Sequence, residues 1–154
     1  MATARFLGEF DVTLDAKGRV MLPAMLKKQM PKKAQNRFVI NRGFEKHLVL
    51  YPFSEWEIIS AEVSDLNLYV KDNRDFARYF FRGATELIPD GTGRILLPKS
   101  LLDYASIEKD VILFAYINRV EVWNKKLYNR QMDEEPRDFV KLAELVMGKK
   151  EEKK

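Results

Sequence analysis

The sequence contains no cysteine and a single histidine among its 154 residues. Without thiols the chain can form neither disulfides nor cysteine-based zinc sites, and it has no thiolate nucleophile. No apolar run approaches the roughly 18 residues that a membrane helix requires. The N-terminal MATARF segment also lacks the apolar core of a secretory signal. We therefore expect a cytoplasmic protein that has no membrane partner.

The charge is mildly basic and unevenly distributed. The formal net charge is +4, and residues 1–36 contain seven Lys or Arg against three Asp or Glu. Such an excess permits contact with phosphate groups without requiring it. The terminal KKEEKK run mixes both signs, which is typical of a solvated tail.

An internal repeat is the most informative feature of the chain. The segment DAKGRVMLPAML at 15–26 returns as DGTGRILLPKSL at 90–101, an offset of 75 residues. Further along, HLVLY at 47–51 aligns with RVEVW at 119–123 at an offset of 72, and this alignment also pairs 39–40 with 111–112. Two copies are too few for a solenoid, so we expect them to pack against each other.

Residues that usually carry catalysis are scarce. The alignment places His47 opposite Arg119, which favours a polar strand residue over a catalytic base. There is no glycine-rich phosphate-binding motif, and Asp15 and Asp90 both belong to turn signals. We expect no enzymatic activity, no cofactor, no metal and no small-molecule substrate.

Each copy predicts a strand followed by a tight basic loop. Phe10, Val12 and Leu14 alternate with polar residues, which is the pattern of a half-buried strand. Gly18 permits a left-handed backbone, and the Asp15 side chain can accept N–H groups within the turn. A short strand, a short helix and a hairpin follow. Four short strands and one helix cannot bury both faces alone, so two copies should interleave into one barrel.

The repeat divides the chain into four parts. We expect a first repeat at 6–53, linking helices at 54–80, a second repeat at 81–128 and a C-terminal tail at 129–154. A capping-box pattern from Ser54 to Glu57 predicts the start of the linking helices. A further helical pattern lies in the tail near 137–147, with Pro136 at its start.

The paired loops and the segment between them resemble the MraZ family of bacterial transcription regulators, a two-copy branch of the AbrB-like swapped-hairpin β-barrel superfamily. The marks of this likeness are FLGE at 6–9, the first loop at 15–23, Trp56, the helix at 74–84 with its FFRGA end, and the second loop at 90–98. The resemblance implies a mainly β fold with helices (α+β). It would be a double AbrB-like swapped-hairpin β-barrel formed by the two repeats, with linking helices and a helical C-terminal tail.

The same resemblance implies a sequence-specific regulator that binds double-stranded DNA. The first and last residues of each Asp-x-x-x-Arg motif carry over as DNA-binding residues, and here they are Asp15, Arg19, Asp90 and Arg94. Lys17 lies inside the first loop, and we add it as a phosphate contact. The family regulates the cell-division and cell-wall gene cluster, so the expected target is a set of direct repeats upstream of the chain's own operon. The resemblance also implies a ring-like homo-oligomer located in the cytoplasm and nucleoid.

Other interpretations of the loops remain open. Each arginine could simply form an internal ion pair with the aspartate of its own loop and hold the loop's shape. The second loop has no counterpart of Lys17, so the two loops could contact DNA unequally.

Two further alternatives concern segments outside the loops. Arg74, Arg78 and Arg82 recur every four residues and could form a second DNA surface, although the resemblance favours a subunit interface for this helix. The charged tail permits an antitoxin-like or other protein-interaction module, although two fused copies argue against it.

Overall fold

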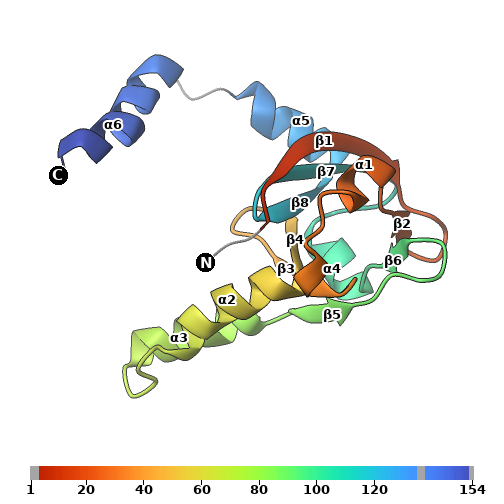
Figure 1. Ribbon diagram of the computed structural model, residues 1–154, viewed down its shortest axis with the longest axis horizontal. Coiled ribbons are helices and arrows are strands. Elements are labelled where there is room, and N and C mark those ends of the chain that lie inside the picture. Colours follow the sequence, from red (N-terminus) through yellow and green to blue (C-terminus); the bar gives the residue numbers. More distant parts are fainter. Residues whose placement is uncertain (1–3, 135–137, 153–154) are drawn as a thin grey trace.

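The computed structural model describes residues 4–134 and 138–152 (Figure 1). The elements of the first copy are β1 (Phe6–Thr13), β2 (Arg19–Met21), α1 (Ala24–Lys27), a 3₁₀ turn (Lys32–Ala34), β3 (Phe38–Arg42) and β4 (Leu48–Pro52). Two linking helices follow, α2 (Phe53–Ser64) and α3 (Lys71–Phe81). The second copy contains β5 (Thr85–Leu87), β6 (Arg94–Leu96), α4 (Lys99–Tyr104), β7 (Asp110–Ile117) and β8 (Arg119–Asn124). The C-terminal helices are α5 (Lys125–Asp133) and α6 (Phe139–Glu152).

The strands of the two copies interleave in the sheets, as the repeat predicts. The larger sheet is antiparallel and has the order β1-β7-β8-β4-β3-β5, while β2 pairs with β6 in a separate ribbon. Strand β1 of the first copy therefore pairs with β7 of the second, and β5 of the second copy pairs with β3 of the first. This exchange confirms the α+β fold with interleaved, swapped copies. Among the described strands, β1 and β5 are free edges of the larger sheet, so its ladder does not close into a barrel.

Two strand pairs show that the copies are related by an approximate two-fold axis. Val20 lies opposite Ile95 in the β2–β6 ribbon, and Val49 lies opposite Glu121 between β4 and β8. In each case the two partners are equivalent residues of the repeat. Because both pairings are antiparallel, equivalent residues lie opposite each other where a two-fold axis passes between the strands.

The predicted alignment of 39–40 with 111–112 is wrong by one residue. Phe38 and Ile40 face the main core, and on β7 the core-facing residues are Val111 and Leu113. The register of the hairpins agrees, because Ile40 lies opposite Leu50 whereas Leu113 lies opposite Val122. The β3–β4 hairpin therefore has one more residue between these equivalent positions than the β7–β8 hairpin. The aligned sequences do not reveal where this additional residue lies.

The main core fills the space between the larger sheet, the β2–β6 ribbon and helices α1 and α4. Leu26, Ile40, Leu50, Ile95 and Leu113 are completely buried there. Because both copies contribute to this core and to the ribbon, the loops that flank the ribbon rest on a fixed base. The ribbon and its loops lie at one end of the molecule, at the right of Figure 1.

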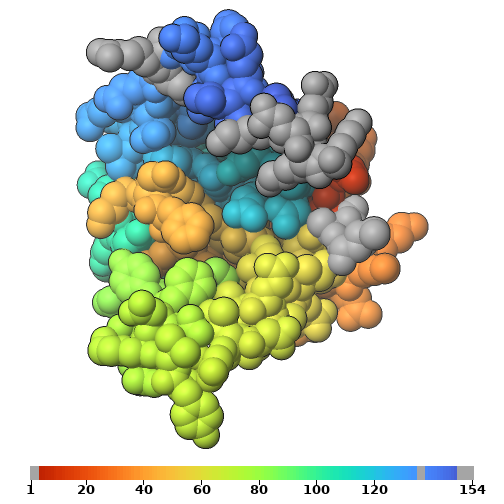
Figure 2. Space-filling model, turned by 90° about the vertical axis from the view of Figure 1, so that its left-hand side faces the viewer, coloured from red at the N-terminus to blue at the C-terminus, as the bar shows by residue number. Residues whose placement is uncertain are grey.

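The linking helices form a hairpin that projects from the sheet, and Figure 2 shows it in yellow and green. Trp56 on α2 stacks on Phe80 of α3, with ring centroids 5.6 Å apart. The capping-box prediction is wrong, since α2 starts at Phe53 with Pro52 as its N-cap and the Ser54 hydroxyl makes no cap hydrogen bond. Pro52 ends β4 and provides an extended backbone from which the helix starts directly.

The C-terminal helices differ in how they are attached. Helix α5 packs on β7 and β8, and the Asn124 side chain caps it by accepting from the N–H groups of Lys126 and Leu127. Helix α6 stands apart from the sheet in Figure 1, and the predicted helix start at 136–137 lies outside the described residues. No helix within the described residues is long and apolar enough to cross a membrane.

Candidate functional site

The first loop is shaped by one carboxylate. Asp15 Oδ1 accepts hydrogen bonds from the backbone N–H groups of Lys17 and Arg19, each at 2.9 Å. Asp15 Oδ2 lies 2.8 Å from Arg19 Nε and forms an ion pair with it. The aspartate therefore fixes both the backbone of the turn and the direction of the arginine.

The second loop repeats this arrangement. Asp90 Oδ1 accepts from the backbone N–H groups of Thr92 and Arg94 at 2.9 and 3.0 Å, and Asp90 Oδ2 lies 2.9 Å from Arg94 Nε. The Thr92 hydroxyl adds a bond of 2.8 Å to the same carboxylate. Threonine thus contributes to loop rigidity at the position where the first loop carries a lysine.

Backbone hydrogen bonds also connect each loop to the other copy across the approximate two-fold axis. Gly18 and Gly93 have φ values of 87° and 89°, which is the left-handed region predicted for the turn. The Gly18 carbonyl accepts from Leu97 N–H at 2.9 Å, and the Gly93 carbonyl accepts from Leu22 N–H at 3.1 Å. The loops are consequently one rigid unit rather than two independent turns.

Both aspartates have a lowered pKa. The Arg19 backbone N–H bond is the largest cause for Asp15, and the Arg19 side chain lowers the pKa further. The pKa of Asp90 falls well below its usual range, chiefly because of the Arg94 backbone N–H and then because of the two bonds from Thr92. Both carboxylates are charged at neutral pH, so each ion pair with its arginine is present.

Each arginine thus forms the internal ion pair with the aspartate of its own loop that was one of the two interpretations of the sequence. The ion pair engages only the Nε atom of the guanidinium. Neither Arg19 nor Arg94 makes a hydrogen bond through Nη1 or Nη2 with the described residues. The arginine side chains are 24% and 33% exposed. Each guanidinium is thus held in position by its aspartate and retains two donor groups for an external acceptor.

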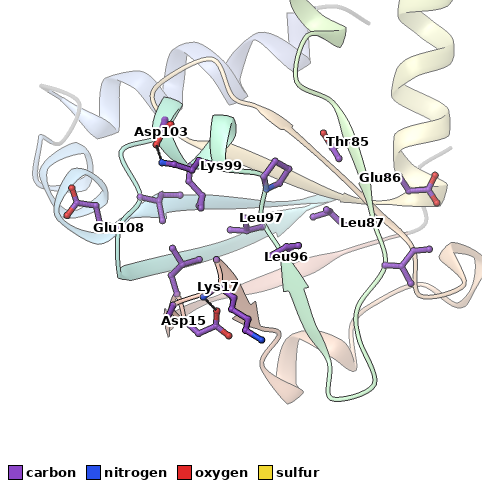
Figure 3. A pocket seen from close by; sticks show the side chains of 17 residues that line it. Asp15, Lys17, Thr85, Glu86, Leu87, Leu96, Leu97, Lys99, Asp103 and Glu108 are labelled. Carbon is purple, nitrogen blue, oxygen red and sulfur yellow. Dashed lines mark hydrogen bonds and ion pairs between the residues drawn. The ribbon is translucent and has the colours of Figure 1, made fainter.

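Lys17 is exposed, and its ammonium makes no hydrogen bond or ion pair with the described part of the chain. In Figure 3 its side chain extends away from Lys99 and Asp103, which lie on the far side of an open groove. The groove has a volume of about 980 Å³ and lies between the first loop, β5 and α4. The five predicted site residues therefore fall into two sets, one on each loop of the ribbon.

Helix α3, which contains Arg74 and Arg78, lies away from the β2–β6 ribbon (Figure 1). Arg74 donates to the Leu68 carbonyl at 2.9 Å, and Arg78 lies 3.9 Å from Asp75 within α3. Both side chains thus have local partners on the helical hairpin.

Within residues 4–134 and 138–152, no group of three or more Asp, Glu or His could hold a metal ion.

Sequence reasoning missed a cavity next to His47. The His47 side chain is 3% exposed, and its ring stacks on Trp123 at a centroid distance of 4.4 Å. It lines a cavity of about 210 Å³ together with Arg42 and Glu121. Burial lowers the pKa of His47, although the charges of Glu121 and Glu45 oppose this effect. A single histidine aligned with an arginine carries no signal of such burial.

Known proteins resemble this chain over nearly all of its length. A family model described as "MraZ protein, putative antitoxin-like" matches residues 5–79 and matches again at 80–146. A protein of Flavobacterium psychrophilum is 42% identical over 143 residues, which cover 92% of this chain and 91% of the relative. A protein of Cytophaga hutchinsonii is 43% identical over 93% of this chain and 95% of the relative. One from Natranaerobius thermophilus is 37% identical over 92% of this chain and 96% of the relative. All three relatives are named "Transcriptional regulator MraZ".

Proposed function

The chain belongs to the MraZ family, and we propose that it is a sequence-specific DNA-binding regulator of transcription. One observation carries the proposal: two equivalent loops present arginines that their own aspartates orient and that keep both Nη groups free. A guanidinium held in this way is suited to a bidentate contact with guanine O6 and N7, or with a phosphate. The names of the relatives support the same function.

Each predicted site residue has a separate role in this proposal. Arg19 and Arg94 contact the DNA directly, while Asp15 and Asp90 position them and remain within the protein. Lys17 contacts a phosphate, which fixes the register of the protein on the duplex without reading sequence. The rigidity of the β2–β6 ribbon supports this division, because little loop ordering is then needed on binding.

We further propose that copies of the chain assemble into a ring and bind direct repeats. The linking hairpin exposes aromatic side chains that a neighbouring copy could cover, including Tyr69 at 96% and Phe76 at 45% exposure. Head-to-tail contacts around a closed ring present every ribbon in the same orientation. The matching DNA would therefore carry direct repeats spaced by about one helical turn, on the order of 10 bp. The target proposed is the cell-division and cell-wall operon that contains the chain's own gene, which places the protein at the nucleoid in the cytoplasm.

Fluorescence anisotropy with a labelled upstream fragment and a scrambled fragment tests the DNA-binding proposal. Arg19→Ala and Arg94→Ala should each lose about 1–3 kcal/mol of discrimination between the two fragments if the arginine contacts a guanine. Arg130→Ala, which removes an exposed arginine from α5, is the matched control and should bind as the parent does. Folded loop variants that bind as well as the parent would show that the loops are not the interface.

Ring assembly is tested by varying the number and phase of the repeats. Three repeats in phase should bind far more tightly than one, because each added repeat binds at a high effective concentration. An insertion of about 5 bp, half a helical turn, should remove most of this gain. Equal affinity for one and three repeats would contradict the ring while leaving DNA binding intact.

A second candidate function is an antitoxin-like interaction with another protein, and helix α6 favours it. This helix exposes a set of apolar side chains, which comprises Phe139, Val140, Leu142, Leu145 and Val146. The dependence of DNA affinity on salt separates the two functions, because each neutralised phosphate contributes a slope of about −0.9 to log K against log salt concentration. A slope of zero would favour the interaction module.

A further inference from the structure

The first copy has two lysines near the loops that the second copy lacks. Lys17 of the first loop is replaced by Thr92 in the second loop. The short helices differ in the same direction, since Lys27 at the end of α1 is replaced by Leu102 in α4. Both lysines thus belong to the first copy, one in its loop and one at the end of its short helix.

The swapped fold places each short helix over the loop of the other copy. Leu102 Cδ1 lies 3.7 Å from the position that a Cβ atom would take at Gly18 of the first loop. Lys27 Cε lies 2.7 Å from the equivalent position at Gly93 of the second loop, and the Lys27 ammonium is closer still. The ammonium of Lys27 is therefore beside the loop that lacks its own lysine.

The Lys27 ammonium is also available for an external partner. Its residue is exposed, and it makes no hydrogen bond or ion pair with the described part of the chain. Asp90 is the nearest acid along the second loop, and its carboxylate is already engaged by Arg94 and Thr92. The positive charge beside Gly93 is thus not neutralised within the loop.

We propose that Lys27 is the phosphate contact of the second loop and replaces Lys17 there. This inference rests on the proposed DNA-binding function and adds a residue to that site. Each DNA-binding unit then consists of one arginine from the loop and one lysine, with the lysine of the second unit supplied by the other copy. The two loops bind the DNA backbone with equal charge although only the first contains a lysine.

The salt dependence of DNA affinity tests this assignment with substitutions taken from the repeat itself. Lys27→Leu installs the residue that the other copy carries, and adding Thr92→Lys then gives the second loop the arrangement of the first. Lys27→Leu should flatten the log–log slope by about 0.9 for each second loop that is bound. The double variant should restore the parent slope. Neither variant should change the preferred sequence, because phosphate contacts do not read bases.

Lys28→Leu is the matched control, since Lys28 follows directly at the same helix end and is also exposed. It should keep the parent slope. The assignment is overturned if Lys27→Leu keeps the parent slope, if Lys28→Leu flattens it equally, or if Thr92→Lys restores nothing. A parent protein that binds upstream and scrambled fragments equally would instead show that the proposed function fails. Unchanged melting temperatures confirm that the compared variants are folded.

Discussion

Replacing Ile95 by alanine should destabilise the protein strongly, because this residue anchors the ribbon that carries both loops. Ile95 is completely buried and lies opposite Val20 on the approximate axis. The substitution removes three methylene equivalents, which cost about 0.8 kcal/mol each in lost transfer free energy. The cavity that remains adds to this loss, so the free energy of unfolding should fall by about 2.5–5 kcal/mol.

Equilibrium denaturation in urea measures this change, with all variants at one protein concentration. Ile95→Val should lose only about 0.5–1.5 kcal/mol, because valine is what the equivalent position already carries. Leu96→Ala is the exposed control on the same strand, at 56% exposure, and should change stability by no more than about 0.5 kcal/mol. If Ile95→Ala and Leu96→Ala were equally mild, the ribbon would not be anchored by the core as described.

Three further predictions concern charge and capping. Asp15→Asn and Asp90→Asn should lower the melting temperature at neutral pH, because hydrogen bonds lower the pKa of each carboxylate. In melting curves recorded against pH, this difference should shrink below about pH 3.9, the ordinary aspartate pKa, because the carboxylates of the unfolded parent chain then take up protons while the folded ones remain charged. Burial lowers the pKa of His47, so the unfolded chain binds a proton more readily and stability should decline below about pH 6.5. His47→Gln should weaken that decline in the same measurement. Asn124→Ala should cost about 1 kcal/mol in urea denaturation by removing the cap of α5.

The repeat predicted more of this structure than any single motif did. Matched loops around Asp15 and Asp90 indicated two similar units, and burying both faces of such small units required their strands to interleave. The left-handed turn at Gly18 followed from local chemistry alone. These features depend on short segments or on symmetry, and both can be recognised in a single sequence.

The features that sequence reasoning missed depend on contacts between distant segments. The one-residue offset between β3 and β7 depends on which side chains face the core, and alternating buried residues on both faces conceal it. The position of Lys27 over Gly93 requires the swapped arrangement, because the two residues belong to different copies. Helix α5 begins at an asparagine cap within a short polar segment, in which Tyr128 is the buried residue.

The most direct test of DNA recognition by the two loops is a footprint of the purified protein on DNA immediately upstream of its own gene. We expect protected segments that recur in one orientation at intervals of about 10 bp. Protection should disappear when Arg19 and Arg94 are both replaced by alanine, and the replacement of Arg130 should leave it unchanged. No protection at low salt, or equal protection by the double loop variant, would contradict the claim that these loops read DNA.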